Sequence, residues 1–232
     1  MLLTRPADPT PSDAGTTLPA EAVAITVVVP VGPGDGPAFE ALARRLGGLA
    51  PGLAVIRAAE GTRARSLNAG ARAARTPFLW FLHADCAVEA RHLEALAAAL
   101  RRAPDAVHFF DLAFVDDGPR AVHLNARGGN LRARLLRLPF GDQGLAMHRD
   151  TWERLGGFPE DLPHGEDHVF VWRAHLEGVP VRRIPLPLPT SARAYREAGW
   201  LRLTLLRQWL WLRQAAPFAL RLAARRLAGR RG

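Results

Sequence analysis

The sequence has no lysine, a single cysteine and no long apolar run, and each absence excludes something. All 31 basic residues are arginine in a chain rich in alanine and proline, so the arginine content reflects GC-rich coding rather than a function. The lone Cys86 excludes an intramolecular disulfide and fits a reducing compartment. Without a signal-peptide pattern or an apolar run of about eighteen residues, we expect a cytoplasmic protein.

The positive charge is concentrated at the C-terminal end. The formal net charge is +9, yet residues 195–232 alone contain nine arginines against one acid, Glu197. The remainder is close to neutral, so no nucleic-acid partner is expected. A length of 232 residues suffices for one α/β domain with a substantial core.

Three segments follow from the pattern along the chain. Residues 1–22 are rich in Pro, Thr, Ala and Asp without an apolar period, which predicts a disordered leader. Residues 23–198 alternate apolar runs with stretches of helical spacing, which is typical of a mostly parallel α/β sheet flanked by helices. Residues 199–232 form a basic amphipathic tail.

The elements of the central segment are predicted from these runs. Strands are expected at 24–30, 53–56, 78–82, 107–115, 144–148 and 181–184. Helices are expected at 38–46, 66–74, 89–100, 122–136, 151–155 and 166–177, and again from 201 onward. A sheet of this kind places its ligand site at the carboxyl ends of the strands.

A polar pair follows directly after the apolar strand 78–82. In an extended backbone His83 and Asp85 project to the same side, where an imidazole and a carboxylate can face one ion or its water shell. The alternative is structural: Asp85 caps the next helix and His83 is a packed residue at the strand end.

Five short motifs occur in order along the chain. They are Gly61-Thr62-Arg63-Ala64-Arg65-Ser66-Leu67-Asn68-Ala69-Gly70, Phe81-Leu82-His83-Ala84-Asp85, Gly141-Asp142-Gln143, Gly156-Gly157-Phe158-Pro159 and Glu166-Asp167. With them the sequence resembles the family-2 glycosyltransferases of GT-A fold over roughly residues 25–214. The resemblance is closest to a bacterial subgroup of the arsenosugar-biosynthesis type.

The resemblance implies an inverting transferase that moves a sugar from a UDP- or GDP-linked donor to a hydroxyl of an unknown acceptor. It implies a Mg²⁺ or Mn²⁺ ion at Asp85, with His83 in the place of the first Asp of the usual Asp-x-Asp signature. Asp167 would be the general base, with Glu166 orienting the acceptor or the base. The implied donor-side residues are Pro30, Asp35, Arg63, Arg65, Asn68, His83 and Asp85, and the acceptor-side residues are Asp142 and Gln143.

Each of these groups also has a structural interpretation. Arg63 and Arg65 precede a helix whose free N–H groups favour anions, but they can equally lie in a solvated loop. Asn68 and Gly70 can serve helix packing. Acidic residues such as Glu166 and Asp167 are favoured at any helix N-terminus, and neighbouring helical positions diverge by about 100°, so only one is expected to point squarely into a cleft.

The sequence departs from the family pattern after the second strand. The usual Asp-containing loop that grips the nucleotide base is missing, because residues 53–60 run directly into Gly61 and about one strand-helix unit is absent. Asp35 and Glu60 are the candidate substitutes. The loss favours a second hypothesis, a degenerate GT-A domain acting as a non-catalytic membrane-associated or partner-binding module. A nucleotidyltransferase is disfavoured because residues 32–36 contain glycine but no basic residue.

The tail has two interpretations. Its apolar residues recur at helical spacing with arginines between them: Trp200, Leu203, Leu206, Leu210 and Trp211. A basic amphipathic segment with tryptophan can lie in an anionic membrane interface, which would make the protein peripheral at the inner face of the membrane. Alternatively, its apolar face packs on the catalytic domain and only the terminal arginines are solvated.

Overall fold

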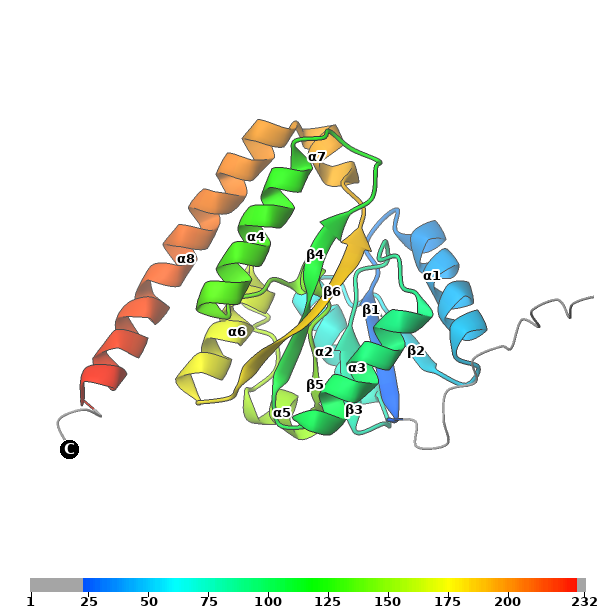
Figure 1. Cartoon of the computed structure of the whole chain (residues 1–232), viewed down its shortest axis with the longest axis horizontal. Helices are drawn as coiled ribbons and strands as arrows, with labels where there is room; N and C mark the ends of the chain where they lie inside the picture. Colours follow the sequence, from blue (N-terminus) through cyan, green and yellow to red (C-terminus); the bar gives the residue numbers. More distant parts are fainter. Residues whose placement is uncertain (1–22, 229–232) are drawn as a thin grey trace, which may run out of the picture.

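A computed structural model describes residues 23–228 as a six-stranded sheet covered by helices on both faces (Figure 1). The strands are β1 (Ile25–Pro30), β2 (Ala54–Ala58), β3 (Phe78–Phe81), β4 (Val107–Phe114), β5 (Ala146–His148) and β6 (Val181–Thr190). The helices are α1 (Gly36–Leu49), α2 (Arg63–Ala73), α3 (Ala90–Arg102), α4 (Val122–Leu136), the 3₁₀ turn η1 (Gly141–Gln143), α5 (Arg149–Arg154), α6 (Glu166–Leu176), α7 (Arg193–Ala198) and α8 (Trp200–Ala228). The expected leader, residues 1–22, lies outside the described residues.

The sheet has the order β2-β1-β3-β5-β4-β6. β1 pairs in parallel with β2 and β3, and β4 pairs in parallel with β6. Only β5 runs against its neighbours, between β3 and β4. The predicted fold, a mostly parallel α/β sheet flanked by helices, is confirmed. The predicted shortening is also present, since residues 59–62 alone join β2 to α2.

Alternation along the buried strands divides the core between the two faces of the sheet. In β1, Val27 and Val29 belong to the hydrophobic cluster under α1 and α3, whereas Val28 belongs to the cluster under α2 and α6. Both sides of the strand are fully buried, as expected for a central strand covered on both faces. This explains why the strand reads as a continuous β-branched run rather than an alternating one.

The last strand is longer than the sequence predicted. β6 continues from 181 to 190 through three prolines, Pro185, Pro187 and Pro189. They occupy alternate positions of an edge strand, so the missing N–H groups fall on one side while the other residues still pair with β4. The prolines therefore prevented prediction of the second half of β6 from the sequence, although an edge strand tolerates them.

Asp111 interrupts the apolar run of β4 and marks a bulge in its pairing with β6. Its buried carboxylate accepts hydrogen bonds from Arg183 Nε at 2.6 Å and Arg134 at 3.1 Å. Burial alone raises the pKa of a carboxyl, but these two guanidinium groups outweigh it and hold the pKa of Asp111 below its ordinary value. The charge thus links β4 to β6 and α4.

We expect Gly70→Ala to destabilise the protein by about 1–3 kcal/mol, because a Cβ at this position of α2 would overlap the buried Val28 side chain of β1. Gly128→Ala, inside α4 with no heavy atom near its would-be Cβ, should instead gain up to about 1 kcal/mol. Urea unfolding of both variants measures this. Equal stability of the two would contradict the close packing of α2 on β1.

We expect Asp111→Asn to lower the free energy of unfolding by about 1–3 kcal/mol at neutral pH. A depressed carboxyl pKa stabilises the fold above the ordinary carboxyl pKa, and that stability disappears as the pH falls through the depressed value. The difference between wild type and variant should therefore shrink in acid. Urea unfolding of both proteins along a descending pH series measures this difference. A difference that does not change with pH would contradict an ionic role for Asp111.

Candidate functional site

A cavity of about 300 Å³ opens at the carboxyl ends of β1 and β3. Its lining residues include Pro30, Gly32, Asp35, Thr62, Arg63, Ser66, His83, Asp85 and Arg193. The loops after β1, β2 and β3 supply most of this wall, as expected for an open α/β sheet, and α2 and α7 complete it. Of the two candidate substitutes for the missing loop, Asp35 lines the cavity and Glu60 does not.

Asp85 lies half-buried in the cavity wall. Its Oδ1 accepts a hydrogen bond from the Thr190 hydroxyl at 2.8 Å, which ties the turn after β3 to the end of β6. Burial raises the pKa of Asp85, and the Thr190 hydroxyl opposes that shift. Asp35, on the same cavity, accepts from the Gly32 amide at 3.2 Å and from Arg193 at 3.1 Å. Two carboxylates therefore border one cavity.

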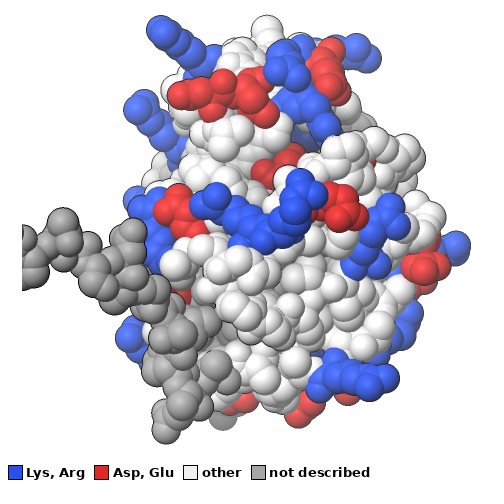
Figure 2. All heavy atoms as spheres, turned by 90° about the vertical axis from the view of Figure 1, so that its right-hand side faces the viewer, with Lys and Arg blue, Asp and Glu red and all other residues white. Residues whose placement is uncertain are grey.

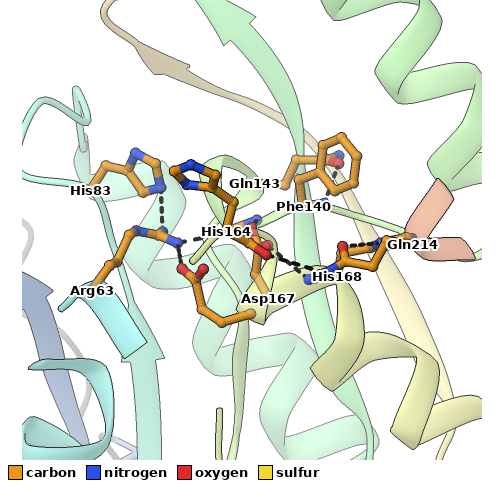
Figure 3. A network of polar contacts seen from close by, with 10 residues as sticks. Arg63, His83, Phe140, Gln143, His164, Asp167, His168 and Gln214 are labelled. Carbon is orange, nitrogen blue, oxygen red and sulfur yellow. Dashed lines mark hydrogen bonds and ion pairs between the residues drawn. The ribbon is translucent and has the colours of Figure 1, made fainter. Parts of the chain in front are cut away.

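His83 lies next to a cation. Its Nε2 is 2.5 Å from Arg63 Nη2, so the ring accepts a hydrogen bond there and its Nδ1 carries the proton (Figure 3). Burial and the Arg63 charge lower the pKa of His83 to about 3, which makes the ring neutral at physiological pH. Because the Nε2 lone pair is used by Arg63, this nitrogen does not serve as a metal ligand in this arrangement.

Arg63, in the first turn of α2, joins the cavity to the N-terminus of α6. One nitrogen contacts His83 and another pairs with the Glu166 carboxylate, while Asp167 Oδ2 lies 4.0 Å away (Figure 3). Burial disfavours the charge on Arg63, but the two carboxylates outweigh it and raise its pKa. The sequence predicted that only one of the two acids would point inward. Both approach the same guanidinium.

Asp167 is held at both carboxylate oxygens. Oδ2 accepts from the Gly141 amide, and Oδ1 accepts from the His168 amide at 2.7 Å. Burial alone raises its pKa, but the Arg63 charge and these amides lower it overall, so the group is ionised at neutral pH. Space here is tight, because a Cβ on Gly141 would lie 2.7 Å from Asp167 Oδ2.

The turn η1 brings Asp142 and Gln143 close to Asp167, and the two side chains differ in their hydrogen bonding. Asp142 Oδ1 is buried without a hydrogen-bond partner among the described residues. Burial and the neighbouring Asp167 charge raise its pKa. The Gln143 side chain is fully buried and bonded at both ends, to the Phe110 carbonyl at 2.9 Å and the Phe140 amide at 3.1 Å. Gln143 therefore fixes the turn η1 to β4, and Asp142 Oδ1 is the acceptor that has no hydrogen-bond partner among the described residues.

The other residues expected on the donor side lie away from the cavity. Arg65 is exposed and pairs loosely with Glu160 at 3.8 Å. Helical positions two apart diverge by about 200°, so Arg63 and Arg65 cannot both face the cavity. The buried Asn68 amide bonds the Phe158 amide and carbonyl and Glu160. It fixes the Gly-Gly-Phe-Pro loop against α2, in line with the packing interpretation.

Sequence reasoning missed several residues around the site. Arg193 of α7 lines the cavity beside Asp35. Gln214 of α8 bonds His168 Nδ1 at 2.9 Å and the His164 carbonyl at 3.2 Å (Figure 3). Arg132 of α4 stacks on Phe140, the residue before η1, at 3.6 Å from the ring centroid. In a chain with 31 arginines, no local pattern distinguishes Arg132 and Arg193 from solvated arginines.

A metal cage of protein side chains is not present in residues 23–228, where no three His, Cys, Asp or Glu gather around one point. A hard divalent cation on a nucleotide sugar needs few protein ligands, because diphosphate oxygens and water complete its coordination. The carboxylate of Asp85, with Asp35 on the same cavity, is a donor set that fits such an ion.

Comparison with known proteins identifies the class. The family model described as glycosyl transferase family 2 matches residues 35–156, more than half of the chain. The chain therefore belongs to glycosyl transferase family 2. A search of the curated proteins finds no match.

Solved structures show the same fold. Residues 1–349 of S. aureus TarS in complex with UDP-GlcNAc match with a TM-score of 0.51 and 15% identity, over 72% of this chain and 58% of that one. A second S. aureus TarS structure matches with a TM-score of 0.50 and 14% identity, over 72% of this chain and 36% of that one. This chain thus spans less than two thirds of the length of these matches.

We expect Arg63→Met to destabilise the protein by about 1–3 kcal/mol, because it leaves the buried Glu166 without its cation. Adding Glu166→Gln should recover part of that loss, giving a coupling energy of at least about 1 kcal/mol in a double-mutant cycle. Arg65→Met is the control and should change stability by less than about 0.5 kcal/mol. Strictly additive effects at Arg63 and Glu166 would show that the pair carries no interaction.

Proposed function

We propose that the protein is an inverting, metal-dependent glycosyltransferase that uses a nucleotide-diphosphate sugar. The observation that carries the proposal is the position of Arg63, which borders the cavity on one side and contacts the Glu166-Asp167 pair on the other. Donor and acceptor would meet across this side chain. The five sequence motifs, from residues 61–70 to Glu166-Asp167, support placement in the arsenosugar-biosynthesis-type subgroup.

On the donor side, the cavity holds the nucleotide diphosphate. Arg63 and Arg193 provide positive charge for phosphate oxygens, and the neutral His83 keeps Arg63 in place. Asp85 and Asp35 would hold Mg²⁺ or Mn²⁺, which supplies charge neutralisation to the departing diphosphate. The TarS complex contains UDP-GlcNAc, so a UDP-linked sugar is the first donor to test and a GDP-linked sugar the second.

On the acceptor side, Asp167 takes the proton. The acceptor oxygen attacks the anomeric carbon, its proton passes to the Asp167 carboxylate, and the bond from the anomeric carbon to the diphosphate oxygen breaks. Glu166 fixes Arg63, and the amides of Gly141 and His168 orient Asp167. Asp142, with one free buried oxygen, would accept a hydrogen bond from an acceptor hydroxyl.

A cytoplasmic location belongs to the proposal. Its support is that the sequence has a single cysteine, Cys86, and so no intramolecular disulfide. Cys86 is buried, and burial raises the pKa of its thiol to about 12.

We expect Mn²⁺ to strengthen binding of UDP or GDP, and a donor screen to detect release of the nucleotide diphosphate. Asp85→Ala should remove the Mn²⁺ dependence of nucleotide binding. Asp167→Asn should keep nucleotide binding and lower turnover about 100-fold or more, because a general base is lost. Asp105→Asn, on an exposed loop, is the matched control and should change neither.

The second candidate is a non-catalytic GT-A module, favoured by the short link 59–62 that leaves no room for a base-gripping loop. Metal-dependent nucleotide binding without turnover of any donor would support it. Absence of nucleotide binding under all conditions would refute the enzyme proposal.

A further inference from the structure

Large apolar side chains are exposed on only two helices of the described chain. Eleven are exposed within residues 23–228, four on α4 and seven on α8. They are Leu124, Leu131, Leu135, Leu136, Leu201, Leu205, Leu206, Trp209, Leu212, Leu220 and Leu227. Single exposed leucines are ordinary, but their confinement to one helix pair indicates an interaction surface. We refer to the outward sides of α4 and α8 as the α4–α8 face.

Helix α8 has two apolar sides. One side packs inward, where Ala215 is buried and Phe218 and Leu222 pack against the main core cluster. The other carries Leu201, Leu205, Trp209 and Leu212, which are spaced by four, four and three residues and so share one side of the helix. Leu205 is 60% exposed and Trp209 is 55% exposed. Core packing therefore accounts for only one of the two sides.

Helix α4 runs beside α8 in the same direction (Figure 1). Asn125 bonds Thr204 at 2.8 Å, and seven residues further along each helix Arg132 stacks over Trp211 at 5.6 Å. Its inward side is small and buried, at Val122, Ala126 and Ala133. Leu124, Leu131 and Leu135 lie on the opposite side, so a second apolar row accompanies that of α8.

The charge of the two helices has one sign. Residues 122–136 and 200–228 contain nine arginines and no Asp or Glu. By contrast, the face that carries α1 and β2 shows arginines interspersed with acids (Figure 2). Arg202 and Arg213 are exposed next to the apolar row of α8. Leucine and tryptophan bordered by cations match the boundary between acyl chains and anionic headgroups.

We propose that the α4–α8 face docks the protein on the surface of an anionic phospholipid bilayer. No helix within residues 23–228 is long and apolar enough to cross a membrane, so the pair would lie in the interface plane. Charge decides between occupants, because a second copy of this face would set arginine against arginine, whereas anionic headgroups neutralise it. The apolar rows disfavour nucleic acid, which offers phosphates but no apolar layer.

Docking through this face would place the bilayer close to the candidate site. Gln214 of α8 bonds His168 and the loop at His164, directly before the Glu166-Asp167 pair. Arg207 of α8 bonds the Tyr195 hydroxyl at 3.0 Å, near the entrance bordered by Arg193. The inference concerns binding to membranes and stands independently of catalytic turnover.

The test uses the full chain in flotation with vesicles of phosphatidylcholine alone and of phosphatidylcholine with about 30% phosphatidylglycerol. We expect strong binding to the anionic vesicles only, weakening as salt rises. Leu205→Ser with Trp209→Ser should reduce binding at least about 30-fold, because both lose apolar burial in the bilayer. Circular dichroism and urea unfolding verify that the variant folds, since both side chains are exposed.

A charge-matched pair separates this face from overall basicity. Arg202→Gln with Arg213→Gln should reduce binding about 10-fold or more, whereas Arg101→Gln with Arg102→Gln on α3 should change it less than about twofold. Equal losses for both pairs would overturn the assignment of the face. So would absence of binding to anionic vesicles, or a concentration-dependent dimer in light scattering that the Leu205→Ser, Trp209→Ser variant abolishes.

Discussion

The candidate site depends on one half-buried cation, Arg63, that faces two carboxylates. Arg63 lines the cavity at the ends of β1 and β3 and also forms ion pairs with Glu166 and Asp167 at the N-terminus of α6. Without its charge, the buried Glu166 and the partly buried Asp167 would be adjacent acids that repel each other. With it, the pKa of Asp167 falls, and burial together with the same charge lowers the pKa of His83, so the Asp167 carboxyl is ionised and the imidazole is neutral.

The single antiparallel strand explains how the turn η1 comes to lie beside Asp167 and Arg63. β5 lies between β3 and β4, and Phe81 donates its amide to the Leu145 carbonyl at 2.8 Å. That pairing carries η1 over the end of β3, and Gln143 anchors it to the Phe110 carbonyl. Gly141 can then donate to Asp167 because it has no Cβ to intrude. A reversal in sheet direction thus positions the loop whose Gly141 amide contacts Asp167.

Helix α8 links this site to the surface. Its inner side completes the core through Ala215 and reaches the site through Gln214. Its outer side, together with α4, retains the exposed leucines and Trp209. The proposed donor, acceptor and membrane contacts therefore lie at three different places: the cavity, η1 and the α4–α8 face.

The sequence alone determined the elements and the position of the chemistry along them. Apolar runs and helical spacing predicted most strands and helices close to their observed bounds, because burial imposes a period of two or 3.6, but α7 was not predicted. Asp85 was expected at the carboxyl end of a buried strand, and the order of five motifs indicated the family. Prolines concealed the second half of β6, since the edge position that permits them is a property of the whole sheet.

Only the tertiary structure decided which side chains meet. Arg63 and Glu166 are separated by 103 positions, and nothing in either local pattern predicts their pairing. The contact between His83 Nε2 and the Arg63 guanidinium likewise joins residues whose local patterns do not predict it. Gln143 and Asn68 use both ends of their side-chain amides for hydrogen bonds within the fold. The sequence determines which groups lie at strand and helix ends, whereas long-range packing decides which of them keep a free lone pair for a ligand.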